Sequence, residues 1–179
     1  MKNFLYVDNS NLWIEGMHVA AVASGLAPDI RTACTKKICD WAWRLDFGRL
    51  FDFAGGPMIG RAVLFGSRPP LNDSLWNHAI SEGFDVFVYD RNAQNREKKI
   101  DTQMTAEMIT DSYELMNAGD TVTICSGDSD HIPAIEKLRG RGFNVDVCFW
   151  DHANWEVKQS ATRFVSLNQH LEHLRLNLP

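Results

Sequence analysis

The segment TVTICSGDSDHIPAIEKLRGRGFNVDVCFW, residues 121–150, contains the pattern that decides the fold. It holds two short, continuously apolar runs, Val122–Cys125 and Val145–Phe149, which are typical of strands buried on both faces of a sheet. Between them, His131–Gly140 has apolar residues at helical spacing. These are Ile132, Ile135 and Leu138. A strand, a helix and a second strand in this order predict a parallel pair of strands joined by a crossover helix.

The same alternation continues on both sides of this segment. Three more apolar runs and one weaker run predict strands at Phe4–Val7, Ala62–Phe65, Val86–Tyr89 and Arg163–Leu167. Crossover helices are predicted at Leu75–Glu82 and at Thr102–Ala118, the second with an apolar stripe at Met104, Met108 and Leu115. We therefore expect an α/β fold with a mainly parallel sheet of five to six strands. Residues 17–53 are less regular, and we expect one or two helices there, around Ile30–Trp43.

The chain has the size and composition of one globular domain, which we expect to span residues 1–179. Hydrophobic residues make up 45% of the 179 residues, which excludes global disorder. No apolar run approaches the roughly 20 residues of a membrane helix, and the start, MKNFLYVDNS, does not resemble a signal peptide. None of the four cysteines forms a C-x-x-C pair, so we expect buried, reduced thiols in a cytoplasmic protein. They are Cys34, Cys39, Cys125 and Cys148.

Acidic residues follow several of the predicted strands. Asp8 ends the first strand, Asp101 begins a helix after the third, and the sequence SGDSD after the fourth supplies Asp128 and Asp130. Ligands of an open parallel sheet bind at the carboxyl ends of its strands, so these acids should meet on one rim, with Asn11 beside the first. Clustered carboxylates repel one another, and a hard divalent cation such as Mg²⁺ or Mn²⁺ removes that repulsion. The pattern predicts an all-oxygen metal site.

Each acid also has a simpler interpretation. Asp101 and Asp130 stand where they would cap the helices that follow them. Asp8 has no obvious local partner, so its functional interpretation is as strong as the structural one. Glu107 shares helical spacing with Asp111 and Glu114, which favours a solvated helix face over a metal ligand.

Basic residues gather in one loop of a chain that is acidic overall. The chain has 18 Lys plus Arg and 23 Asp plus Glu, a net charge of −5, which argues against coating nucleic acid by bulk charge. The loop after the third strand nevertheless carries four cations against Glu97, and Arg68 follows the second strand. The four cations are Arg91, Arg96, Lys98 and Lys99. Beside a metal site they would suit a phosphate backbone, although a solvated surface loop explains them equally well.

Four segments resemble a known family. They are YVDNSNLW at 6–13, KKIDTQMTAEM at 98–108, ICSGDSDHIPAIEKLRGRGFNVDV at 124–147 and NWEVKQSATRFVSL at 154–167. Together they resemble a NYN domain of the LabA type, within the PIN-like nuclease superfamily. The Ser-Gly-Asp-Ser-Asp segment is the most specific of them. The match covers most of the chain apart from residues 17–53.

The resemblance implies a Rossmann-like, three-layer α/β/α fold of the PIN-like kind and a metal-dependent ribonuclease site. By motif position it assigns catalysis and metal binding to four acids, with Asn11 in support. The acids are Asp8, Asp101, Asp128 and Asp130. Glu107 stands where relatives often have a second helix aspartate, and a direct metal contact there is an open question. Three positions depart from the family pattern: Ile100 replaces the usual glycine, Glu107 replaces an aspartate, and His131 stands where relatives commonly have an aromatic residue.

Our leading hypothesis is a cytoplasmic, Mg²⁺- or Mn²⁺-dependent ribonuclease that cleaves RNA, with Arg68, Arg91, Arg96, Lys98 and Lys99 steering the substrate. A homodimer or a protein partner is compatible with the sequence. One alternative is a non-catalytic module that binds RNA or protein with the same fold. The other is a Mg²⁺-dependent phosphatase of the haloacid dehalogenase type, which needs a second acid two residues after the first. Ser10 occupies that position and argues against this class.

Overall fold

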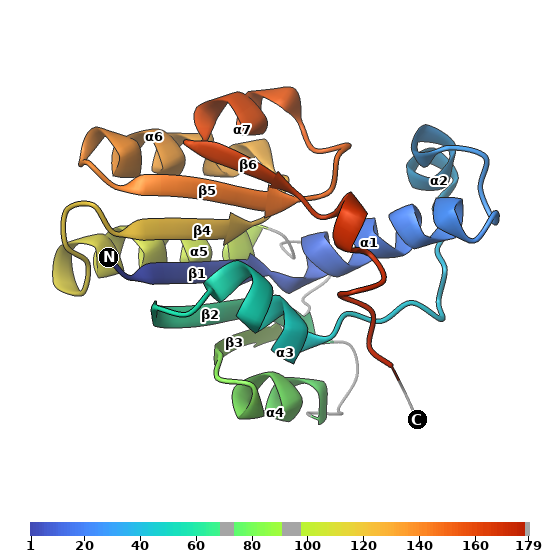
Figure 1. Cartoon of the computed structure of the whole chain (residues 1–179), viewed down its shortest axis with the longest axis horizontal. Coiled ribbons are helices and arrows are strands. Elements are labelled where there is room, and N and C mark those ends of the chain that lie inside the picture. The colour runs from blue at the N-terminus through green and yellow to red at the C-terminus, as the bar shows by residue number, and fades with distance from the viewer. Residues whose placement is uncertain (69–73, 91–97, 178–179) are drawn as a thin grey trace.

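The protein is built around a parallel β-sheet with helices on both faces (Figure 1). The structure, a computed structural model, describes residues 1–68, 74–90 and 98–177, without the side chains of residues 68, 90, 98 and 99. The strands are β1 (Asn3–Asp8), β2 (Ile59–Arg68), β3 (Asp85–Asp90), β4 (Thr121–Cys125), β5 (Asn144–Phe149) and β6 (Arg163–Ser166). In the described ranges all six strands pair in parallel, in the order β3-β2-β1-β4-β5-β6. The predicted parallel sheet is confirmed.

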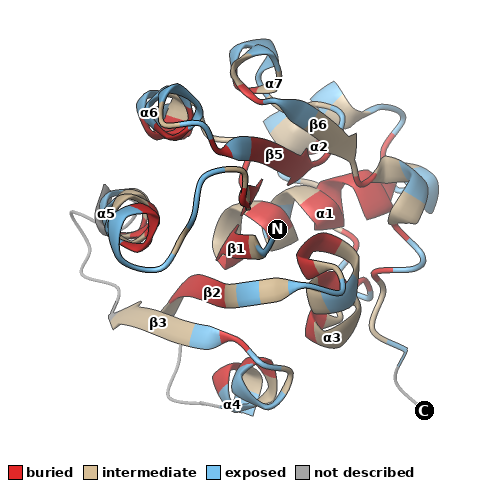
Figure 2. Ribbon diagram, turned by 60° about the vertical axis from the view of Figure 1, so that its left-hand side comes forward, coloured by how far each residue is buried: buried red, intermediate tan, exposed pale blue. Residues whose placement is uncertain are grey.

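Helices form the two outer layers. They are α1 (Asn9–Ala23), α2 (Ile30–Lys36), α3 (Phe47–Leu50), α4 (Ser74–Ser81), α5 (Lys98–Glu114), α6 (Ile132–Gly140) and α7 (Trp155–Ser160). Figure 2 shows α5 and α6 on one side of the sheet and α1 and α3 on the other, which is the expected three-layer arrangement. Short helical turns of π and 3-10 type complete the chain at Phe51–Gly55, Ser129–His131 and Asn168–His170. No helix in the described ranges is long and apolar enough to cross a membrane.

Strand β1 lies at the centre of the sheet, so its carboxyl end lies at the middle of the rim where the predicted acids should meet. Its neighbours are β2 on one side and β4 on the other, with Val7 level with Leu64 and Cys125. Residues 4–8 of β1 are all buried, as expected for a strand covered on both faces. The chain leaves β1 at Asp8 on the same rim where it leaves β4 after Cys125. Crevices of open parallel sheets form where neighbouring strands connect in opposite directions, and β1 and β4 flank such a point.

Two tryptophans hold α1 against the carboxyl-terminal part of the chain. The rings of Trp43 and Trp150 meet edge to face at 5.7 Å. A Cβ atom at Gly16 would lie 2.7 Å from both rings, so glycine allows the backbone of α1 to approach them. The indole N–H of Trp150 donates to the carbonyl of Leu12 at 2.8 Å, and that of Trp43 to the carbonyl of Leu171 at 3.1 Å. These contacts fix the helix that begins directly after Asp8.

The structure departs from the sequence predictions mainly before residue 53. Helix α1 starts at Asn9, where no helix was expected, and α2 ends at Lys36, well short of Trp43. In the second crossover helix, Met104 and Met108 are buried, but Leu115 lies past the last helical residue and is 49% exposed, so its assignment to the apolar stripe was wrong. Two of the cysteines, Cys34 and Cys39, are only half-buried, whereas Cys125 and Cys148 are buried as expected.

Candidate functional site

Three carboxylates meet at the rim where β4 ends. Asp101 comes from the first turn of α5, and Asp128 and Asp130 come from the segment after β4. One oxygen of each lies within 4.8 Å of the others, which is close enough for a single cation to contact all three. The sequence predicted this convergence, and the structure brings these three together.

The local geometry removes the capping interpretation for two of these acids. Asp128, not Asp130, is the N-cap of the short 3-10 turn, because its Oδ1 accepts the backbone N–H of Asp130 at 2.9 Å. The following helix, α6, has no side-chain cap. Asp101 lies within the first turn of α5 rather than before it. Asp130 is exposed, while Asp101 and Asp128 are half-buried, so the group has an inner part and a solvent-facing part.

Asp8 ends β1 on the same rim, next to the group of three but outside it. It is only 7% exposed and does have a local partner, contrary to the expectation from sequence. As the N-cap of α1 it accepts the backbone N–H of Asn11 at 3.1 Å. This bond uses Oδ1 and fixes the carboxylate at the start of the helix.

Asn11, in the first turn of α1, connects the end of β1 to the segment after β4 that carries Asp128 and Asp130. Its side-chain oxygen accepts the backbone N–H of Gly127 at 3.0 Å and the hydroxyl of Ser126 at 3.4 Å. The Ser126 hydroxyl in turn accepts the N–H of Asp128 at 3.2 Å. A chain of hydrogen bonds therefore runs from the turn after β1 to the first acid after β4. Asn11 therefore lies beside the acids, where the sequence predicted it.

His131 lies beneath the acidic group. Its side chain is 1% exposed, and its Nε2 is 3.8 Å from Oδ1 of Asp101. Within the described residues neither ring nitrogen has a hydrogen-bond partner. Burial lowers the pKa of His131, although Asp128 and Asp130 act in the opposite direction. The sequence offered little to mark this contact, because Asp101 and His131 belong to different helical segments.

Glu107 is held away from the acidic group. It lies six residues after Asp101 on α5, about 9 Å along the helix axis. Its Oε2 accepts a hydrogen bond from Arg61 at 3.0 Å, and its Oε1 accepts one from Gln103 at 3.0 Å. The structure thus places this residue in an ion-pair network, where Arg61 already balances its charge.

The structure does not describe the side chains of the basic residues that are expected to steer the substrate. Arg91 and Arg96 belong to residues that the structure does not describe, and the side chains of Arg68, Lys98 and Lys99 are likewise outside it.

The comparison with known families agrees with the α/β arrangement of the sheet and helices. The NYN domain profile matches residues 11–168 of the 179-residue chain. The chain belongs to the NYN domain family. NYN domains are part of the PIN-like nuclease superfamily, whose members typically use divalent metals. The acidic group of this NYN domain could bind such an ion. No curated protein sequence matches the chain significantly.

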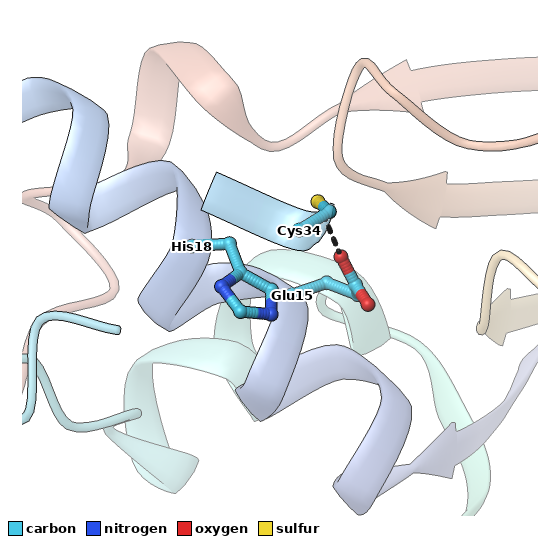
Figure 3. Close-up of side chains that lie close together, drawn as sticks. All are labelled: Glu15, His18 and Cys34. Carbon is cyan, nitrogen blue, oxygen red and sulfur yellow. Dashed lines mark hydrogen bonds between the residues drawn. The ribbon is translucent and has the colours of Figure 1, made fainter. Parts of the chain in front are cut away.

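A second group of ligand-type side chains in this NYN domain was not anticipated from the sequence. Glu15 and His18 on α1 meet Cys34 on α2, with one ligand atom of each within 4.8 Å of the others (Figure 3). The three-residue spacing of Glu15 and His18 puts them on one face of α1. No residue near them in the sequence predicts that Cys34 packs against that face.

Proposed function

We propose that this NYN domain is a metal-dependent ribonuclease that hydrolyses RNA phosphodiester bonds at the acidic rim. The observation that carries the proposal is the meeting of Asp101, Asp128 and Asp130 within 4.8 Å, beside the end of β1. Membership of a nuclease superfamily supports a nucleic-acid substrate.

The donor set fits a hard divalent cation. All the proposed ligands are carboxylate oxygens, which suit Mg²⁺ or Mn²⁺ rather than zinc. In such sites the ion polarises a phosphoryl oxygen and lowers the pKa of a bound water. Three carboxylates at this distance repel one another strongly, so the group itself favours a bound cation.

The residues of the site divide into ligands and positioning groups. Asp101 and Asp128 would hold the ion together with Asp8, which is buried at the end of β1, and Asp130 lies close enough to Asp101 and Asp128 to share it. Asp130 is exposed and would orient the attacking water or a second ion. Asn11 would keep the two loops in register through its bond to Gly127. Glu107 has no part in this scheme, since Arg61 engages it.

The substrate and location follow from charge and chemistry. RNA would be guided by basic residues at the end of β2, after β3 and at the start of α5. These are Arg68, Arg91, Arg96, Lys98 and Lys99. All four cysteines are free, which supports a reducing, cytoplasmic environment.

The decisive experiment compares cleavage of mixed RNA and DNA substrates by the wild type, Asp8→Asn and Asp128→Asn in the presence of Mn²⁺. We expect each variant to lose at least about 100-fold in rate while keeping the circular-dichroism spectrum of the wild type. Asp52→Asn, an exposed aspartate outside the rim, serves as the matched control and should cleave normally. A variant that cleaves RNA as fast as the wild type would refute the assignment of its carboxylate.

The same preparation separates the proposal from its alternatives. A non-catalytic binding module would hold RNA without Mn²⁺-dependent cleavage and would show no Mn²⁺ affinity at millimolar concentration by calorimetry. A phosphatase would form an acyl phosphate on Asp8, detectable by mass. The structure argues against this second alternative, because Ser10 lies within α1 where the second acid would be needed.

A further inference from the structure

Glu15, His18 and Cys34 form a mixed carboxylate, imidazole and thiol cluster that the acidic rim does not use. Figure 3 shows the three side chains turned toward one another, two from α1 and one from α2. The thiol of Cys34 donates to Oε2 of Glu15 at 3.5 Å. Glu15 lies about 10 Å along α1 from Asp8, so the two clusters are separate.

Hydrogen bonds with neighbouring groups orient two of these side chains, His18 and Glu15, for metal binding. A ring nitrogen can only donate to a carbonyl, so the 2.8 Å contact between Nδ1 of His18 and the carbonyl of Ile38 places the proton on Nδ1. Nε2 of His18 then carries a lone pair. On the other side, His152 lies with Nε2 2.6 Å from Oε2 of Glu15 and orients the carboxylate. Outer contacts of this kind are typical around metal-binding histidines and carboxylates.

We propose that Glu15, His18 and Cys34 bind a zinc ion that joins α2 to α1. Tetrahedral zinc with oxygen, nitrogen and sulfur ligands separates its ligand atoms by about 3.3–3.7 Å. The sulfur and oxygen of Cys34 and Glu15 are already 3.5 Å apart, and all three ligand atoms lie within 4.8 Å. A movement of roughly 1 Å by the histidine closes the remaining gap. Sulfur and imidazole favour zinc over Mg²⁺ or Mn²⁺.

The proposed zinc site lies between α1 and α2, and α2 has few buried residues to hold it in place. Within α2 only Ala33 is buried, and the helix projects from the far end of α1 (Figure 1). A helix of this length is not stable by itself and needs tertiary contacts. Burial and the Glu15 carboxylate raise the pKa of the Cys34 thiol to about 11, so the ion must displace a proton there. Glu15 and Cys34 are only half-buried, so an ion can reach them from solvent.

The test uses Co²⁺ as a probe of the zinc site, because zinc itself has no optical transitions. The full chain is titrated with Co²⁺ in excess Mg²⁺, and the near-ultraviolet charge-transfer band of a thiolate–cobalt bond is recorded. The acidic rim contains no sulfur and cannot produce this band. We expect the band in the wild type, its displacement by equimolar Zn²⁺, and a zinc-dependent rise in melting temperature.

Two variants and a control decide the assignment. Cys34→Ser should abolish the band and the thermal shift, and Glu15→Gln should weaken zinc binding at least about tenfold, the loss typical even of outer contacts. Cys148→Ala removes a thiol from the core and should retain both signals. Metal-free melting curves show that each variant is folded. No band in the wild type, or a band that persists in Cys34→Ser, would overturn the proposal.

Discussion

The side-chain oxygen of Asn11 accepts the backbone N–H of Gly127 at 3.0 Å, and this bond joins the start of α1 to the segment that carries Asp128 and Asp130. Asn11 lies in the helix that follows β1, and Gly127 lies in the segment that follows the neighbouring parallel strand β4. The side-chain amide of Asn11 therefore helps to hold the segment with Asp128 and Asp130 in place relative to Asp8.

Replacing Asn11 by alanine should separate the loops without unfolding the protein. We expect the free energy of unfolding to fall by about 1–2 kcal/mol, because the N–H of Gly127 loses its acceptor. Metal-dependent cleavage should fall at least about tenfold, since the ligands lose their register. Asn77→Ala on the exposed surface of α4 is the control and should change neither quantity. Full activity in Asn11→Ala would show that the sheet alone positions the acids.

Gly127 should not tolerate a side chain. A Cβ atom there would lie 2.4 Å from the ring of Phe149, so Gly127→Ala must displace either the ring or the loop. We expect a loss of about 1–3 kcal/mol in stability and weaker Mn²⁺ binding by calorimetry. Gly140→Ala, with nothing within 4 Å, should be neutral or stabilising by up to about 1 kcal/mol. A double variant with Phe149→Leu that loses less than the sum of the single variants would confirm the clash.

Arg61 should be a strong stability determinant. Its guanidinium donates to Asp85, Glu107 and Asp111, and Asp111 is buried and also accepts the hydroxyl of Tyr6 at 2.6 Å. Arg61→Ala leaves Asp111 as an unpaired buried charge, so urea unfolding should show a loss of about 2–4 kcal/mol.

The control for this variant is an arginine with an exposed partner. Arg175 pairs with Glu172, whose side chain is 70% exposed, so Arg175→Ala should cost at most about 1 kcal/mol. Equal losses in the two variants would contradict a special role for the Arg61 network.

His131→Phe should separate stability from activity. Within the described part of the chain neither ring nitrogen of His131 is hydrogen-bonded, so an apolar ring of similar size should leave the free energy of unfolding unchanged or raise it by about 1 kcal/mol. Cleavage should fall severalfold, because the imidazole 3.8 Å from Asp101 is lost. Thermal melts and initial rates test both parts. A clearly destabilised variant would reveal a polar partner of His131.

Asp120 should contribute to stability in a pH-dependent way. Its carboxylate accepts the backbone N–H of Lys2 at 2.7 Å and that of Asn117 at 2.9 Å. Hydrogen bonds from Asn117 and Lys2 lower the pKa of Asp120 in the folded state. The stabilisation is therefore complete above the unfolded-state pKa of about 3.9 and is lost as the pH falls through the folded value. Urea unfolding at several values between about pH 3 and about pH 6 tests this. Asp120→Asn should be less stable than the wild type at the upper end of the range, and the difference should shrink toward the lower end.

The sequence predicted the sheet and the acidic group because both depend on short-range patterns. A strand buried on both faces, such as β1 or β4, is a continuous apolar run. Asp8 stands at the end of one such run, and Asp128 and Asp130 follow another within five residues. Helix α1 was missed for a related reason. It is buried along much of its length between the sheet and two tryptophans, so it lacks the polar face that marks a surface helix.

Contacts between side chains that are far apart in the chain could not be predicted from the sequence. The pairing of Glu107 with Arg61 depends on how α5 docks on β2, and the meeting of Cys34 with Glu15 depends on how α2 docks on α1. Neither docking follows from the residues near those positions. Such pairs need the assembled tertiary structure, because their partners are brought together only by the packing of whole elements.

The position of β4 beside β1 also determines when the acidic rim can form during translation. A nascent chain can pair β1 with β2, and β2 with β3, as these strands leave the ribosome. Strand β4 begins only at Thr121, so it joins β1 after them. Until then Asp8 and Asp101 have no Asp128 or Asp130 beside them. If the rim cleaves RNA, the nascent enzyme is inactive toward the message that encodes it until the segment with Asp128 and Asp130 has been synthesised.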